Sequence, residues 1–218
     1  MPSRYSDDLA DIASQASERL ELRNRAREQA LPASREVIRF SANAIRAVHR
    51  GDFEDARKLL DRAAQRLKDT NEIRQEAPEI YFAGFMTDAR KEFTEAHVTL
   101  AVLSGQKLPK PHELDVEPST YLNGMAEVIG EVRRYILDSL RRDSFEGCQE
   151  FMDVMDEIYS ILVTVDFPEA VTGGLRRSTD QMRGVLERTR GDLTMALRQH
   201  KLEAQLARWE RRQSESGG

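Results

Sequence analysis

Cysteine and histidine are scarce in this sequence. Its 218 residues include one cysteine, Cys148, and four histidines. A single cysteine excludes a disulfide within the chain and a zinc site with several thiolate ligands, and it suits a reducing compartment. None of the histidines forms a Glu-x-x-His pair with the acidic segments described below, which argues against a ferritin-like di-iron centre.

Long apolar runs are missing as well. No run approaches the about 20 residues that a membrane span requires. The first segment, MPSRYSDDLADIASQ, carries acids where an export signal has an apolar stretch. We therefore expect a cytoplasmic protein without membrane contact. The net charge of -5 excludes a uniformly basic surface, so any nucleic-acid contact must come from local clusters of arginine and lysine.

The sequence also lacks the alternation of apolar and polar residues that is typical of β-strands. The segments between glycines and prolines follow the helical period instead, which predicts an all-α fold, and we expect one domain over residues 1–218. Pro32 is predicted to follow the end of the first helix and Ser34 to cap the second. The seven predicted helices cover residues 5–29, 35–49, 52–74, 80–103, 120–142, 145–165 and from 175 onward, before a frayed tail at about 210–218.

The predicted helix 80–103 is apolar on nearly every side, yet it carries three carboxylates in one line. At 100° per residue, Asp88, Glu92 and Glu95 fall within a wedge of about 60°. A helix that is mostly apolar is mostly buried, and carboxylates near a buried surface are costly unless something compensates their charge. A divalent cation, a cluster of arginines or solvent exposure of the line would each do so.

A row of arginines follows one side of the predicted helix 35–49. Arg35, Arg39, Arg46 and Arg50 lie within about 60° of one another, opposite an apolar face, and no glutamate is interleaved in the row. Arginines repeated along a helix suit the phosphates of a nucleic acid. A simple solvated face is the alternative.

Two further helices carry acids. The predicted helix 120–142 has a face of mixed charge that includes Glu127 and Glu131, which is typical of a solvent face with weak ion pairs. The predicted helix 145–165 has an acidic line that ends at Glu157. Glu157 is bordered by apolar residues, so its carboxylate is a candidate to complete a site begun by Glu92 and Glu95.

The last helix has the spacing of a packed seam. Its apolar residues repeat at intervals of 7, 4, 7 and 4. They are Leu175, Met182, Leu186, Leu193 and Leu197. The seam can pack inside its own bundle or against another subunit. Trp209, beyond the seam and surrounded by charge, favours a contact between subunits.

Several of these segments resemble the family of translin and translin-associated factor X. The factor X signature Glu-aromatic-x-Glu-Ala is similar to KEFTEA, residues 91–96. The family's basic helix is similar to RFSANAIRAVHR, residues 39–50, and its Tyr-Leu-x-Gly helix with a following Gly-Glu-Leu is similar to YLNGMAEVIGEVRRYILDSL, residues 121–140. The family helix with a Phe and an aromatic residue eight positions later aligns with EFMDVMDEIYSIL, residues 150–162. The resemblance covers roughly residues 30–200.

This resemblance implies an all-α, seven-helix subunit that assembles into a closed shell, commonly an octamer. Translin binds single-stranded RNA and DNA, and factor X subunits add a metal-dependent endoribonuclease activity inside the shell. By the same resemblance, Glu92 and Glu95 match the two signature acids. The third family acid is an aspartate six residues after the helix Phe, and counting from Phe151 gives Glu157, with Asp153 and Asp156 as neighbouring alternatives.

We therefore predict a cytoplasmic endoribonuclease that uses Mg²⁺ or Mn²⁺ at Glu92, Glu95 and Glu157 to cleave single-stranded RNA. The arginine row would bind the strand, with single-stranded DNA as a second candidate ligand. The assembly would be a homo-oligomer, or would include a translin-like partner subunit. The alternatives are a translin-like binding shell without catalysis and a purely structural helical oligomer.

Overall fold

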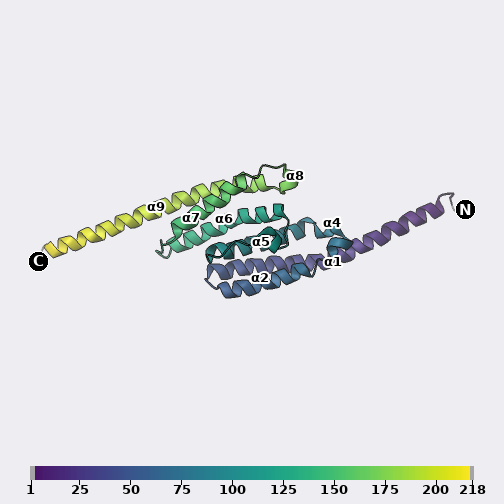
Figure 1. Cartoon of the computed structure of the whole chain (residues 1–218), viewed down its shortest axis with the longest axis horizontal. Helices are drawn as coiled ribbons and strands as arrows, with labels where there is room; N and C mark the ends of the chain where they lie inside the picture. Colours follow the sequence, from purple (N-terminus) through teal and green to yellow (C-terminus); the bar gives the residue numbers. More distant parts are fainter. Residues whose placement is uncertain (1–2, 217–218) are drawn as a thin grey trace. The chain divides into compact units, whose positions relative to one another are not determined.

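The computed structural model describes residues 3–216, and within that range it contains helices and no strand (Figure 1), which confirms the all-α prediction. The helices are α1 (Ser6–His49), α2 (Phe53–Lys68), α3 (Ile73–Glu76), α4 (Pro78–Tyr81), α5 (Gly84–Leu103), α6 (Pro118–Leu140), α7 (Cys148–Val163), α8 (Glu169–Thr172) and α9 (Leu175–Ser216), with a 3-10 turn, η1 (Pro111–Glu113), before α6. The chain divides into two compact units, and the division falls inside α6, after Gly124. A single domain over residues 1–218 stays a prediction.

Helix α1 runs through Pro32, so the predicted break there was wrong. A proline inside a helix removes one backbone donor and costs about 3 kcal/mol. Here Pro32 is exposed, while residues on the opposite side, such as Ala30, Ala33 and Val37, are buried. Ser34 is buried too and donates its hydroxyl to the Leu31 carbonyl at 2.9 Å, so it does not cap a new helix. Burial of this side against α2 and α5 favours one continuous helix.

Helix α2 returns along α1 after a tight turn (Figure 1). Gly51 takes a left-handed φ of 78°, and the Asp52 carboxylate accepts a hydrogen bond from the Asp55 backbone N–H at 3.1 Å. The residues that face α1 repeat at intervals of 4, 3 and 4. They are Ala56, Leu60, Ala63 and Leu67.

The predicted helix 80–103 is interrupted near its start. Helix α4 ends at Tyr81, Ala83 is extended with ψ 151°, and α5 begins at Gly84. The interruption frees the Tyr81 carbonyl, which accepts a hydrogen bond from the Arg90 guanidinium at 2.9 Å. Beyond it, α5 is the central buried helix of its unit, and Met86, Phe93 and Val98 are almost completely buried.

The start of α6 lies very close to α5. A Cβ atom at Gly124 would come within 2.7 Å of the Lys91 carbonyl oxygen and 2.9 Å of the Thr94 Cβ. Such distances leave no room for a side chain, so glycine permits this close approach. The two helices therefore meet backbone to backbone at this point.

In the second unit, α9 packs on α7. Leu175, Leu186 and Leu193 of the predicted seam are buried within this unit, in agreement with the bundle interpretation. Arg133 of α6 donates to Thr189 at 2.9 Å and pairs with Asp192 at 2.9 Å, which ties α6 to α9. The helix continues to Ser216, further than the fraying expected at about residue 210, and residues 217–218 lie outside the described residues.

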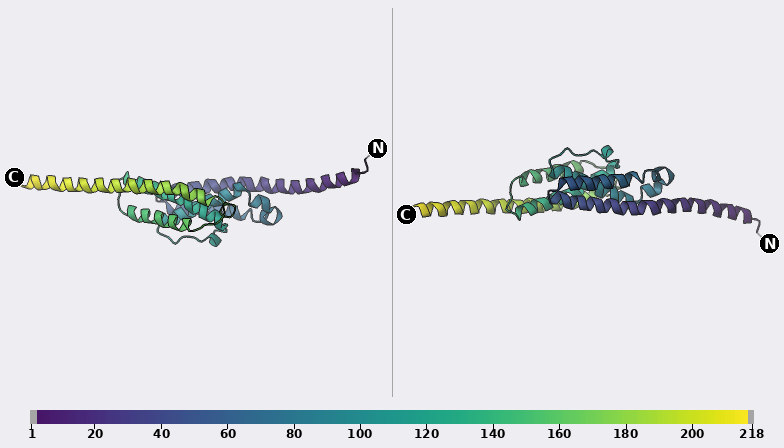
Figure 2. Two further views of the ribbon diagram at one scale, coloured as in Figure 1. Left: turned by 90° about the horizontal axis from the view of Figure 1, so that it is seen from above. Right: turned by 90° about the horizontal axis from the view of Figure 1, so that it is seen from below.

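Both terminal helices extend beyond the other helices of their own unit (Figure 2). Both also carry exposed apolar side chains. At the start of α1 these are Leu9, Ile12 and Leu20, together with Tyr5 directly before the helix. On the second half of α9 they are Met195, Leu202, Leu206 and Trp209, of which Trp209 is 60% exposed. No helix within residues 3–216 is both long enough and apolar enough to cross a membrane.

Candidate metal centre and nucleic-acid interface

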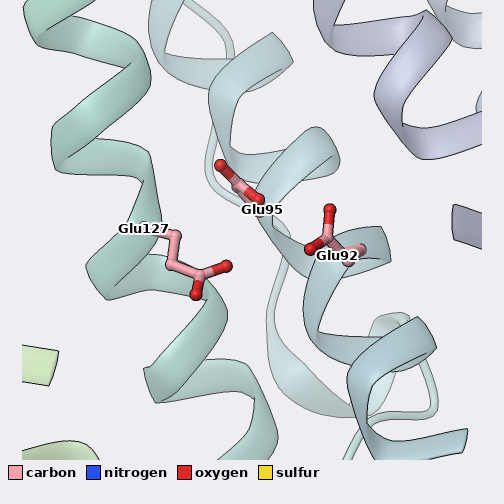
Figure 3. A group of neighbouring side chains, drawn as sticks. All are labelled: Glu92, Glu95 and Glu127. Carbon is pink, nitrogen blue, oxygen red and sulfur yellow. The ribbon is translucent and has the colours of Figure 1, made fainter. Parts of the chain in front are cut away.

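Three glutamates from two helices gather at one point (Figure 3). Glu92 and Glu95 of α5 and Glu127 of α6 each place a carboxylate oxygen within 4.8 Å of the others. Glu95 is only 8% exposed, and Glu92 and Glu127 are half-buried. We call this group the acidic cluster.

Local geometry explains how these side chains meet. Glu92 and Glu95 are three residues apart, so they project from neighbouring points on α5. Glu127 follows Gly124 by three residues on the same uninterrupted helix and therefore projects from the side of α6 that Gly124 holds against α5. The close contact at Gly124 thus positions the third carboxylate.

The acidic cluster has the chemistry of a divalent cation site. Three carboxylates at this separation repel one another, and the repulsion is stronger where water is partly excluded. Mg²⁺ binds oxygen at about 2.0–2.1 Å, so two of its ligand oxygens lie at most about 4.2 Å apart. The observed limit of 4.8 Å exceeds that span by well under 1 Å, which small side-chain rotations can close.

The arginine row lies exposed along α1, as predicted. Arg35, Arg39, Arg46 and Arg50 are all solvent-exposed. The expectation that nothing compensates their charge was wrong, because acids outside the row reach it. Glu36 pairs with Arg39 at 3.3 Å, and Asp55 of α2 pairs with Arg50 at 3.8 Å.

Helix α2 adds arginines that the sequence analysis did not single out. The Arg62 guanidinium lies 4.3 Å from the centre of the Phe40 ring, and that of Arg39 lies 5.3 Å from it. Arg66 pairs with Glu36, the partner of Arg39. The α1 row together with Arg62 and Arg66 forms what we call the α1–α2 basic surface.

Comparison with known proteins decides the family. An uncharacterised protein of Methanocaldococcus jannaschii is 33% identical over 184 residues, which cover 84% of this chain and 81% of that protein. Two structures of AfC3PO, one of them a complex with duplex RNA, share 34% identity with TM-scores of 0.77 and 0.78 and cover 84% of this chain and 95–96% of theirs. The chain belongs to the translin and translin-associated factor X family.

Two further comparisons give less information about this translin-family chain. The structure of apo-NeC3PO has a TM-score of 0.71 at 18% identity, covering 86% of this chain and 96% of its own, which supports the fold alone. No model of a protein family matches the sequence.

The translin-family signature segment KEFTEA supplies two of the three carboxylates of the acidic cluster, Glu92 and Glu95. The other acids that sequence reasoning considered are elsewhere. Asp88 is exposed one turn before Glu92 and is not a member of the cluster. Glu157 is exposed on α7 and is not a member either, so its role as third ligand stays a prediction.

The two alternatives to Glu157 have other contacts within the second unit. Asp153 accepts a hydrogen bond from the Gln149 side chain at 2.9 Å. Asp156 is paired with Arg190 of α9 at 2.5 Å. Neither belongs to the acidic cluster.

Sequence reasoning missed Glu127. The mixed-charge pattern of its helix predicted a solvent face, and that expectation was wrong for Glu127, which is half-buried beside α5. The pattern does describe its neighbours: Arg134 pairs with Glu131 and Arg141 with Asp138. The available signal was Gly124, a glycine inside a strongly helical segment, because such a residue often marks close packing of two backbones.

Proposed function

We propose that this translin-family protein is a metal-dependent endoribonuclease and that Glu92, Glu95 and Glu127 hold its Mg²⁺ or Mn²⁺. The observation that carries the proposal is the convergence of three carboxylates from two helices, one of them almost fully buried. A divalent cation bound there supplies charge neutralisation at a scissile phosphate and activation of a water molecule. The chain's own contribution is to orient the three carboxylates and to limit access of bulk water to Glu95.

We further propose that RNA binds through the α1–α2 basic surface. A structure of AfC3PO, at 34% identity, is a complex with duplex RNA, and exposed guanidinium groups bind phosphates of either single or double strands. The sequence-based expectation of a single-stranded substrate follows from the need to bring one phosphate to a small site. Both forms of RNA therefore belong in the test.

The exposed apolar residues on the first half of α1 and the second half of α9 support assembly into a homo-oligomer, with the closed octamer as the expected form. Apolar side chains exposed along unpartnered stretches of helix mark surfaces that another subunit covers. Under this proposal the acidic cluster works inside the shell, in cytoplasmic conditions.

An RNA-binding oligomer without catalysis is the second candidate. It is favoured by the AfC3PO complex itself, in which duplex RNA is bound. The two candidates differ in what metal does: a nuclease needs the cation for cleavage, and a binding shell does not.

The deciding experiment incubates labelled single-stranded and duplex RNA with the purified protein in Mg²⁺, in Mn²⁺ and in EDTA. We expect cleavage that requires metal and that is lost in Glu92→Gln and in Glu127→Gln, with RNA binding retained. Glu157→Gln is the matched variant, with the same chemical change on α7. Loss of cleavage in Glu157→Gln but not in Glu127→Gln would restore the original assignment, and binding without cleavage in every condition would favour the second candidate.

A further inference from the structure

Arg90 of α5 is a charged residue that is almost completely buried. It is 5% exposed, one of its terminal nitrogens donates to the Tyr81 carbonyl at 2.9 Å, and its guanidinium carbon lies 3.9 Å from the centre of the Tyr81 ring. The other terminal nitrogen, Nη2, is shielded from solvent and has no hydrogen-bond partner. A buried charged donor without a partner is costly, so this nitrogen indicates an interaction that the chain alone does not supply.

The surroundings of Arg90 are two small cavities in the first unit, each of about 230 Å³. Both are lined by Arg90, Tyr81 and Asp115. The first is also lined by hydroxyl-bearing residues, Thr87, Ser119 and Thr120. A volume of this size accommodates a small ligand with a few polar groups, and hydroxyl groups on its wall can donate to such a ligand.

A second arginine stands at the rim of the first cavity. The Arg74 guanidinium lies 5.6 Å from the centre of the same Tyr81 ring and is about half-exposed. The guanidinium groups of Arg74 and Arg90 therefore lie beside the same ring, at 5.6 and 3.9 Å from its centre, and their like charges repel each other. Two cations that disfavour each other in this way are both stabilised by an anion between them.

In this structure the carboxylate of Asp115 partly supplies the negative charge that such an anion would bring. Asp115 lies on the loop before α6, takes a positive φ of 51°, and pairs with Arg74 at 3.9 Å. Glu117, which also lines the first cavity and is about half-exposed, pairs with Arg74 at 3.7 Å, and no hydrogen bond joins it to the unpartnered Arg90 nitrogen. The negative charge of Asp115 also acts on Arg90, although no hydrogen bond joins the Asp115 carboxylate to Nη2. An aspartate in the left-handed region is uncommon, and a long ion pair with a half-exposed arginine contributes little stability. The carboxylate of Asp115 can therefore be displaced at low cost.

We propose that the cavity between Arg74 and Arg90 binds a small oxyanion, either a phosphate group or a carboxylate, which takes over Arg90 Nη2 and displaces the Asp115 carboxylate. The site is separate from the acidic cluster, because Arg90 and Glu92 are two residues apart on α5 and project to different sides of the helix. The proposed anion site does not depend on the nuclease proposal. Planar, forked guanidinium groups are well matched to both kinds of oxyanion.

The test uses calorimetric titration of the full-length protein with inorganic phosphate and, separately, with acetate. EDTA is present so that no metal at the acidic cluster binds phosphate, and chloride at equal ionic strength is the reference. We expect saturable binding of at least one of the two anions. Phosphate binding alone assigns a phosphate-bearing ligand, acetate binding alone assigns a carboxylate, and binding of both supports the shared site.

Three variants identify the residues. Arg90→Gln should weaken binding about tenfold or more, because a charge-assisted hydrogen bond from a buried group is lost. Asp115→Asn should tighten binding about two- to fivefold, since asparagine accepts a positive φ and removes the competing charge. Arg57→Gln, at an exposed arginine of α2 that lines neither cavity, is the matched control and should leave binding unchanged.

If Arg90→Gln does not fold, two other variants still test the proposal. Asp115→Asn should bind the anion more tightly, and Arg74→Gln should bind it more weakly. The proposal is overturned if neither the natural protein nor Asp115→Asn binds phosphate or acetate more tightly than chloride. Equal weakening in Arg57→Gln and Arg74→Gln would also overturn it, because the effect would then be one of net charge.

Discussion

His97 of α5 shows how burial of one residue sets a dependence on pH. Its ring packs edge-on against Phe93 with centroids 4.5 Å apart, and its Nε2 atom is buried without a hydrogen-bond partner. Burial lowers the pKa of His97 to about 4, and the negative charge of Asp61 only partly opposes this. The folded state therefore holds a neutral imidazole where the unfolded chain holds a partly protonated one.

The free energy of unfolding should consequently fall as the pH is lowered from above 6.5 towards 4. Because the unfolded state binds the proton more tightly, the contribution of His97 is complete above pH 6.5 and about 2 kcal/mol of it is lost at pH 5. Urea unfolding at pH 7 and pH 5 measures the difference. His97→Phe should reduce it, and His200→Gln, at an exposed histidine, should not. An unchanged pH dependence in His97→Phe would contradict this account.

At the same scale, the sequence predicts that Glu92 and Glu95 lie side by side, and it gives no direct sign that Glu127 joins them. The first two stand in one helix, where spacing alone places them side by side. The third comes from a different helix, and its position depends on how closely two backbones approach at Gly124. Glu157, which is exposed on α7, was predicted instead from its apolar neighbours and from its distance of six residues from Phe151 in the family resemblance. Neither signal reports which side of another helix lies next to α5.

Among the elements, α5 and α6 depend on that glycine. Gly124→Ala should lower the free energy of unfolding by about 1–3 kcal/mol, because the added methyl group collides with the Lys91 carbonyl oxygen and the Thr94 side chain. If Mn²⁺ binds the acidic cluster as proposed, Gly124→Ala should also weaken the rise in melting temperature expected from Mn²⁺, since Glu127 moves away from α5. Scanning fluorimetry with and without Mn²⁺ measures both effects.

Gly130→Ala on the same helix is the control, because a Cβ atom there meets nothing within 4 Å. It should raise the free energy of unfolding by about 0.5–1 kcal/mol through helix propensity alone. If both alanine variants behaved alike, the close approach of α5 and α6 would not be what holds Glu127 in place.

Helix α1 carries the second prediction at this scale. Arg39→Glu combined with Arg46→Glu should weaken RNA binding and reduce the dependence of log K on log salt by roughly 1.4–1.8, because about 0.7–0.9 is lost for each phosphate contact. Fluorescence anisotropy over a salt series measures both. Arg141→Glu combined with Arg142→Glu makes the same change in net charge at exposed residues outside the α1–α2 basic surface. If both double variants weakened RNA binding equally, the net charge of the protein, and not the α1–α2 basic surface, would account for the affinity.

The helix boundaries show what local sequence signals can and cannot decide. Caps and breakers predicted the α2 start at Asp52 and the break before Leu175 well. They failed at Pro32, where burial of the opposite side of α1 outweighs one lost hydrogen bond, and at Ala83, where α4 and α5 separate just before Gly84 inside the predicted helix 80–103. Tertiary packing decided both cases, and it cannot be read from one segment alone.

For the whole molecule, assembly is the property to test. Leu206→Glu combined with Trp209→Glu should shift the mass measured by light scattering from the oligomer towards the 24.9 kDa subunit, because both apolar side chains are exposed beyond the packed part of α9. Gln205→Glu combined with Gln213→Glu adds the same charge at exposed polar positions and should leave the mass unchanged. A natural protein that is monomeric at micromolar concentration would remove both the shell and the enclosed site.

The first half of α1 has a consequence for the free subunit. No residue between Ser6 and Arg25 is buried; the first buried position is Ala26. Near the end of this stretch, Arg23 pairs with Glu79 of α4 at 3.1 Å. A helix of about 20 residues that buries no side chain is marginal in water, because its nucleation is unfavourable. Amide hydrogens of residues 6–25 should therefore exchange rapidly in dilute protein and slowly once oligomers form, which would make helix–coil equilibrium at this end a direct reporter of subunit association.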